Sequence, residues 1–125
     1  MKIPIKTAMA PTAIGPYSQG IVAAGKFFFL SGQLPIHPAT GEMPEGIAAQ
    51  TEQSLLNAKA ILESKGLTLD NVVKTTVLLS DIANFGPMND VYAKFFNQPF
   101  PARSAFAVKD LPKGALVEIE MIAVD

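Results

Sequence analysis

The residues best suited to chemistry lie near the end of the chain, in the stretch PARSAFAVKDLPKGALVEIEMIAV at 101–124. This apolar, strand-like sequence contains one arginine, Arg103, and two carboxylates, Glu118 and Glu120. Because side chains alternate along a strand, the two glutamates share one face. A guanidinium is always charged, and burying it without a carboxylate in reach costs several kcal/mol. We therefore expect Arg103 to bind one of these glutamates or the carboxylate of a ligand.

The residues alone do not decide whether Arg103 and the glutamates serve a ligand site or form structural salt bridges. Arg103 opens its strand, so it is expected at a sheet end where a cleft can form, but a cross-strand or intersubunit salt bridge explains it as well. A mid-strand glutamate is more often half-exposed or paired with a structural cation than catalytic. The six-residue link KDLPKG is not a two-residue turn, so the distance between Arg103 and Glu118 is not fixed by sequence.

Three further candidates lie in turn-rich segments. Tyr17, in GPYSQG, is placed to present an aromatic ring at a pocket rim, with an ordinary buried tyrosine as the alternative. Gly32, in SGQ, allows a ligand to approach the backbone closely, although turn geometry also explains it. His37 is the only histidine and lies in a proline-rich loop. With no second histidine and no cysteine, we expect neither a metal site nor a Ser/His triad.

Composition excludes several classes of function. The formal net charge is -1, the pI is about 5.8 and no run of Lys or Arg occurs, so nucleic acid is not expected as a partner. No glycine-rich phosphate loop is present. The absence of cysteine excludes disulfides and a thiol nucleophile. No signal-peptide core and no stretch near the roughly 18 apolar residues of a membrane span is present, so we expect a soluble cytoplasmic protein.

Hydrophobic periodicity predicts the elements that must position these residues. Ile47, Thr51 and Leu55 begin an amphipathic helix whose polar side includes Gln50 and which ends at Gly66. Four consecutive apolar residues at 27–30 predict a strand buried on both faces, in a hairpin closed by Gly25. The predicted strands are 2–7 at an edge, then 21–24, 26–31, 71–80, 102–108 and 115–124, and a second helix, capped by Asn84, carries Phe85, Met88, Tyr92, Phe95 and Phe96 as a core stripe.

After the N-terminal segment, these elements follow the order ββαβαββ. This order predicts a two-layer α+β sandwich with a mixed sheet and both helices on one face. The strands at 71–80 and 115–124 are apolar on both sides, and one copy of the chain has no element left to cover the second face. We therefore expect self-association to cover it. A length of 125 residues fits one domain.

Five segments resemble the reactive-intermediate deaminase family, also called the Rid or YjgF family. They are AIGPYSQG at 13–20, SGQLP at 31–35, VVKTTVLLSD at 72–81, PARSAFAV at 101–108 and LPKGALVEIEMIA at 111–123. The resemblance runs essentially end to end, over a single domain at 1–125. It implies a chorismate-mutase-like fold assembled as a homotrimer, with clefts between subunits.

The resemblance also implies an activity: hydrolysis of 2-aminoacrylate and related enamine or imine acids to 2-keto acids and ammonia, without a cofactor. By the same resemblance Arg103 binds the substrate carboxylate, Glu118 positions or activates water, and Tyr17 lines the pocket. The residues implied to contact substrate are Ser31, Gly32, Asn89 and Ala105, although helix capping or interface bonding explains Asn89 equally well. Ala105 stands where many members have cysteine; it keeps the backbone N–H and lacks the thiol. Glu120 receives no role.

Two other functions stay open at this point. A non-catalytic trimer could use the Arg103 cleft to sense a small 2-keto or amino acid. Some relatives are described as RNA-cleaving translation inhibitors, but one loop histidine and no basic patch speak against that activity here.

Overall fold

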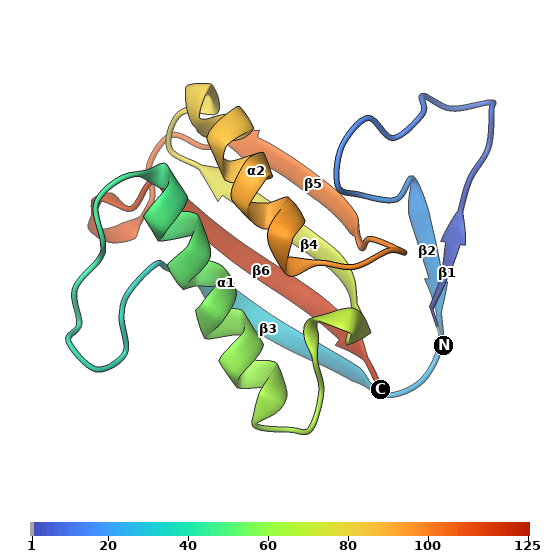
Figure 1. Cartoon of the computed structure of the whole chain (residues 1–125), viewed down its shortest axis with the longest axis horizontal. Coiled ribbons are helices and arrows are strands. Elements are labelled where there is room, and N and C mark those ends of the chain that lie inside the picture. The colour runs from blue at the N-terminus through green and yellow to red at the C-terminus, as the bar shows by residue number, and fades with distance from the viewer. Residues whose placement is uncertain (1) are drawn as a thin grey trace.

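The computed structural model describes residues 2–125, and its elements form two layers (Figure 1). The strands are β1 (Lys2–Ile5), β2 (Gly20–Ala23), β3 (Phe27–Gln33), β4 (Val72–Leu79), β5 (Ala102–Ala107) and β6 (Val117–Val124), and the helices are α1 (Ile47–Glu63) and α2 (Phe85–Phe95). Short 3₁₀ turns at Leu69–Asn71, Ile82–Asn84 and Pro112–Gly114 connect them.

The main sheet has the order β3-β6-β4-β5. β4 runs parallel to β5 and antiparallel to β6, so the sheet is mixed. Both helices lie on one face of this sheet, as predicted (Figure 1). The strand at 71–80 was also correctly predicted as central, because β4 has a partner on each side.

The core lies between the helices and the helix-facing side of the sheet. Val117 and Ile119 of β6 and Leu55 of α1 are fully buried there, as are Met88 and Tyr92 of α2. This confirms that the aromatic stripe of the second helix is mainly core. Asn84 occupies the N-cap position of α2, but its side chain makes no capping hydrogen bond.

Two predictions about the N-terminal strands were wrong. β2 pairs with β1 rather than with β3, and β3 pairs with β6, so Gly25 does not close a hairpin. Instead, Gly25 has φ 137° and passes so close to the Asp125 carbonyl that a Cβ has no room. The run at 27–30 is not buried on both faces of this chain, because Phe27 is 50% exposed and Phe29 76% exposed on the side away from the helices.

Gln50 also departs from its prediction, since it is buried rather than on the polar side of α1. Its Nε2 donates to the Pro44 carbonyl at 3.0 Å, and its Oε1 accepts from the Leu116 amide at 2.8 Å. The buried amide therefore ties the loop before α1 to the start of β6. None of the helices within residues 2–125 is long and apolar enough to cross a membrane.

Ser54→Ala should stabilise the fold. The Ser54 hydroxyl is fully buried in α1 and finds no hydrogen-bond partner within the described chain. Burying an unsatisfied hydroxyl costs about 1–3 kcal/mol, so its removal should raise the free energy of unfolding by about 1 kcal/mol in urea denaturation.

Ser64→Ala is the matched control. Its hydroxyl lies on the exposed end of the same helix and donates to the Ile61 carbonyl at 2.6 Å. We expect no gain from this change. A Ser54→Ala protein less stable than the wild type would show that the hydroxyl has a partner, such as a buried water.

Candidate functional site

Arg103 is the only arginine of the chain and the second residue of β5. Its side chain extends to the helix-facing side of the sheet, where Nη1 donates to the Asn89 Oδ1 of α2 at 2.6 Å. Three aromatic rings surround the guanidinium. The Cζ atom is 4.8 Å from the ring centroid of Tyr92, 5.5 Å from that of Tyr17 and 5.6 Å from that of Phe85. Cation–π attraction therefore holds a planar cation in this position.

No carboxylate of the described chain neutralises this guanidinium. Burial lowers the pKa of Arg103, and the neighbouring Tyr92 and Tyr17 raise it; no acidic side chain contributes. The group carries five N–H donors, and the side chains of residues 2–125 engage it through Asn89 alone. The remaining donors and the uncompensated charge suit a planar anion such as a carboxylate. This answers the question posed by the sequence: within one chain, neither Glu118 nor Glu120 binds Arg103.

The aromatic surroundings of Arg103 were missed by sequence reasoning, which assigned Phe85 and Tyr92 to the core alone. Tyr92 is fully buried, and its hydroxyl shares a 2.8 Å hydrogen bond with Thr75 of β4. Its ring face remains available to the guanidinium. A usable signal was present in the sequence, because the predicted aromatic stripe packs on the sheet that carries the only arginine.

Tyr17 reaches Arg103 from the loop between β1 and β2. This loop passes beside α2 at Gly15, where a Cβ would lie 3.4 Å from Asn89 Nδ2 and 3.4 Å from the Tyr17 ring, in ordinary contact with both. Ala105, two residues after Arg103, faces the same side and packs against the core. We call Tyr17, Asn89, Arg103 and Ala105 the helix-side half-site.

Glu118 lies on the opposite face of the sheet. It alternates with Val117 and Ile119, which are buried beneath the helices, so its side chain extends from the open face. Its carboxylate occupies the space that a Cβ on Gly32 would need, and Glu118 Cδ is 2.8 Å from that position. This close approach explains why residue 32 is a glycine. Ser31, beside it on β3, is exposed. We call Ser31, Gly32 and Glu118 the open-face half-site.

The two half-sites do not meet within one chain, and the clefts that the resemblance implies lie between subunits rather than within one. Arg103 pairs in register with Thr75 of β4, whereas Glu118 pairs with Leu78 of the same strand, and the two side chains leave opposite faces. Glu120 is exposed and shares the open face with Glu118, as predicted from the alternation of side chains along the strand. It lines a pocket of about 200 Å³ there.

His37 belongs to neither half-site. It is exposed in the loop before α1, and its Nδ1 accepts a hydrogen bond from the Ala39 amide at 3.2 Å. Across residues 2–125, no three His, Cys, Asp or Glu side chains gather as a metal site would require.

The fold and the two half-sites define a class: a small α+β protein with an aromatic-flanked arginine on one sheet face and a glutamate packed against a glycine on the other. The family model described as Endoribonuclease L-PSP matches residues 7–125. The chain belongs to this family, which is the YjgF or Rid family recognised from its motifs.

Curated relatives carry two kinds of name. The 2-iminobutanoate/2-iminopropanoate deaminase of Escherichia coli K12 is 50% identical over 96% of this chain and 95% of its own length. The bovine protein of the same name is 50% identical over 96% of this chain and 88% of its own length. A RutC family protein of Pyrococcus horikoshii is 53% identical over 98% of both chains.

Solved structures share the fold. The crystal structure of the E. coli YjgF gene product matches with a TM-score of 0.77 and 50% identity, over 98% of both chains. A structure of E. coli TdcF with bound serine matches with a TM-score of 0.77 and 44% identity, also over 98% of both chains. The predicted chorismate-mutase-like arrangement of two helices on a mixed sheet is thereby confirmed.

Tyr92 should make the fold sensitive to alkaline pH. Burial raises the pKa of Tyr92 to about 12, although its bond to Thr75 and the charge of Arg103 oppose the rise. In the unfolded chain a tyrosine ionises near pH 10, so between about pH 10 and 12 the unfolded state loses a proton that the folded state keeps. Stability therefore falls as pH rises through this window.

Tyr92→Phe removes the effect of Tyr92 ionisation on stability. Comparison with the wild type therefore separates this effect from that of other titrating groups. The variant lacks the Thr75 hydrogen bond at every pH, and it carries no alkaline penalty because phenylalanine does not ionise. From about pH 9.5 to 11.5, the stability advantage of the wild type over Tyr92→Phe should shrink by about 2 kcal/mol in urea unfolding. A constant difference would mean that Tyr92 ionises normally in the folded state.

Proposed function

We propose that this protein hydrolyses reactive 2-imino and enamine acids, such as 2-aminoacrylate and 2-aminocrotonate, to 2-keto acids and ammonia. The observation that carries the proposal is Arg103: a half-buried guanidinium that has free donors, three aromatic neighbours and no carboxylate partner within residues 2–125. No cofactor is required by the chemistry, and we expect the activity in the cytoplasm.

The relatives support a small amino-acid-like substrate. Several proteins about 50% identical to this chain are named 2-iminobutanoate/2-iminopropanoate deaminases. TdcF, at 44% identity, was solved with serine bound, and serine carries the α-carboxylate that a guanidinium fork would hold. The RutC family names leave the reaction of other close relatives unspecified.

We further propose a homotrimer in which the helix-side half-site of one subunit faces the open-face half-site of the next. The two half-sites lie on opposite sheet faces, so a single copy cannot bring Arg103 and Glu118 to one substrate. The open face also exposes large apolar side chains that a neighbour would cover. Phe29 is 76% exposed, Phe27 50% and Phe106 46%.

In the proposed reaction, Arg103 binds the substrate carboxylate, and Glu118 of the neighbouring subunit acts as general base and general acid. An enamine first tautomerises to the imine. Water then adds to C2 and gives a carbinolamine, with Glu118 accepting a proton from the water oxygen. Glu118 returns this proton to the nitrogen, which completes the carbinolamine. It then relays the carbinolamine hydroxyl proton to the nitrogen, so the C–N bond breaks as the C2=O bond forms, and ammonia and the 2-keto acid leave. Tyr17 forms the rim of the pocket, and the backbone beside Gly32 contacts the substrate amine.

A non-catalytic sensor is the second candidate, favoured by one observation: TdcF is described with an amino acid bound. Such a protein would use the same Arg103 for the carboxylate and would bind 2-ketobutyrate without turning over 2-aminoacrylate. RNA cleavage, which the family description names, is not proposed because the chain has a net charge of -1 and a single exposed histidine.

Arg103→Ala should abolish ammonia release from 2-aminoacrylate generated in situ, by a factor of about 10² or more, while the assembly persists. Arg103→Lys should rescue little, because an ammonium lacks the planar fork that the three rings and Asn89 hold. Lys74→Ala, which removes a cation from β4, is the matched control and should retain activity. Unchanged turnover in Arg103→Ala would contradict the proposal.

Glu118→Gln tests the proton-transfer role separately. The amide is isosteric but cannot accept a proton, so kcat should fall by about 10² or more while calorimetric affinity for 2-ketobutyrate changes little. Equal losses in turnover and in affinity would instead assign Glu118 a structural role. Binding without turnover in the wild type would favour the sensor.

A further inference from the structure

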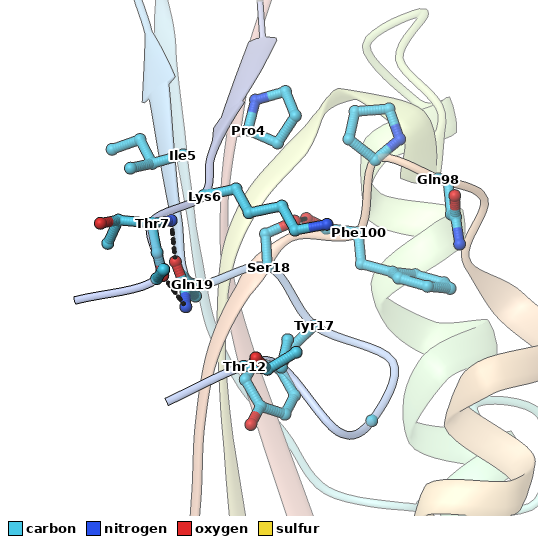
Figure 2. Close-up of a pocket in the computed structure, with 14 residues that line it drawn as sticks. Pro4, Ile5, Lys6, Thr7, Thr12, Tyr17, Ser18, Gln19, Gln98 and Phe100 are labelled. Atoms are coloured by element: carbon cyan, nitrogen blue, oxygen red, sulfur yellow. Dashed lines mark hydrogen bonds between the residues drawn. The ribbon is translucent and has the colours of Figure 1, made fainter. Parts of the chain in front are cut away.

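The loop between β1 and β2 is held by one glutamine. Gln19 directs its side-chain amide into residues 7–11, where Oε1 accepts from the Thr7 amide at 2.7 Å (Figure 2). Nε2 donates to the Thr7 carbonyl at 3.1 Å and to the Pro11 carbonyl at 2.7 Å, with a longer contact to the Ala10 carbonyl at 3.4 Å. One side chain therefore provides both the donor and the acceptor that close this loop.

A second anchor fixes the loop to the strand of Arg103. The Ser18 amide donates to the Pro101 carbonyl at 3.1 Å, and the Ser18 hydroxyl donates to the Phe100 carbonyl at 2.5 Å. Ser18 also forms a parallel β-bridge with Ala102, the residue before Arg103. Tyr17 therefore sits between two fixed points, the strand on one side and the Gln19-bound segment on the other.

The rest of the loop has little packing to keep its shape. Met9 and Ile14 are each 93% exposed, and residues 7–12 are all exposed. Folding such a segment costs conformational entropy that buried contacts do not offset here, so its shape depends on hydrogen bonds. The Gln19 amide supplies most of those described for residues 7–11.

This loop also builds a pocket of about 470 Å³ beside Tyr17. Figure 2 shows the pocket between the β1 side, with Lys6 extending across it, and the segment that carries Gln98 and Phe100. Tyr17 is part of its lining. Tyr17 therefore lies beside both this pocket and the Arg103 guanidinium, and it belongs to the loop that Gln19 closes.

We propose that Gln19 is a positioning residue that keeps the Tyr17 ring against Arg103, and that the reaction depends on it through Tyr17. The inference rests on the proposed role of Arg103 in holding the substrate carboxylate. An amide is required because the loop offers an N–H and carbonyls to the same side chain. Glu would accept from Thr7 but set a carboxylate against carbonyl oxygens, and Leu would do neither.

The first test measures the position of the Tyr17 ring relative to Arg103 by NMR, without any assay of activity. Because Arg103 is the only arginine, its Nε–H gives a single NMR signal, and Tyr92→Phe distinguishes the two tyrosine rings. The wild type should show cross-relaxation between the Tyr17 ring and the Arg103 side chain. Gln19→Leu and Gln19→Glu should lose it. A Gln19→Leu protein that keeps this contact overturns the proposal, whatever its activity.

The second test is a double-mutant cycle on turnover of 2-aminoacrylate. Gln19→Leu should lower kcat/KM by about tenfold or more, since small misplacements of a site group are costly. In a Tyr17→Ala background the same change should have no further effect on kcat/KM. An equal loss in both backgrounds would mean that Gln19 does not act through Tyr17. The effect of Gln19→Leu on thermal stability, in contrast, should be similar in the wild-type and Tyr17→Ala backgrounds.

Gln53→Leu is the matched control. Gln53 is also a half-buried amide in a side-chain hydrogen bond, to Asn57 at 2.9 Å, but it lies on α1 away from the loop. It should leave both the Tyr17 contact and kcat/KM unchanged. If the wild type turns over no imino acid, the proposed function fails, while the NMR contact and its loss in Gln19→Leu still decide whether Gln19 positions Tyr17.

Discussion

A single uncompensated charge constrains this molecule. Arg103 lies half-buried on the helix side of the sheet, where aromatic rings and one asparagine hold it but no carboxylate in the described part of the chain neutralises it. Burying an unpaired charge is expensive, and proteins retain such groups where a ligand completes them. The surrounding rings suit a planar cation, and a carboxylate ligand suits the free N–H donors.

The sheet imposes the second constraint. Glu118 extends from the face opposite Arg103, and its carboxylate fits only because Gly32 lacks a side chain. A site that uses both residues must therefore be built from two copies of the chain. The exposed phenylalanines of the open face supply the apolar surface for such an assembly. The same interface would thus complete the reaction site and cover the sheet.

Much of the fold could be predicted from sequence because its signals are local. The 3.6-residue period of α1 and the β-branched run of β4 each specify an element without reference to distant partners. The pairing of β3 was mispredicted because a short glycine-linked repeat of strands looks like a hairpin, whereas β3 finds its partner in β6, almost a hundred residues away. Gln50 was misplaced because periodicity treats every amide as solvent-facing, although a buried amide can satisfy two loop backbones at once.

The site was predictable in its residue types and less so in its geometry. Alternation correctly put both glutamates on one face, but which face Arg103 uses depends on strand register, which the KDLPKG link does not specify. The contribution of Phe85 and Tyr92 depends on how α2 crosses the sheet, which a helical stripe alone does not determine. The roles of the site residues in the reaction remain proposals drawn from the family and from this geometry.

The central claim is that each reaction site combines Arg103 of one subunit with Glu118 of another, and mixed assemblies test it directly. Arg103→Ala and Glu118→Gln subunits, each inactive alone, should be unfolded, mixed in equal amounts and refolded, with mixed trimers verified by native mass spectrometry. Random assembly should restore about a quarter of the wild-type sites, because that share pairs an intact Arg103 with an intact Glu118. Mixed trimers with no recovered deaminase activity would contradict the account.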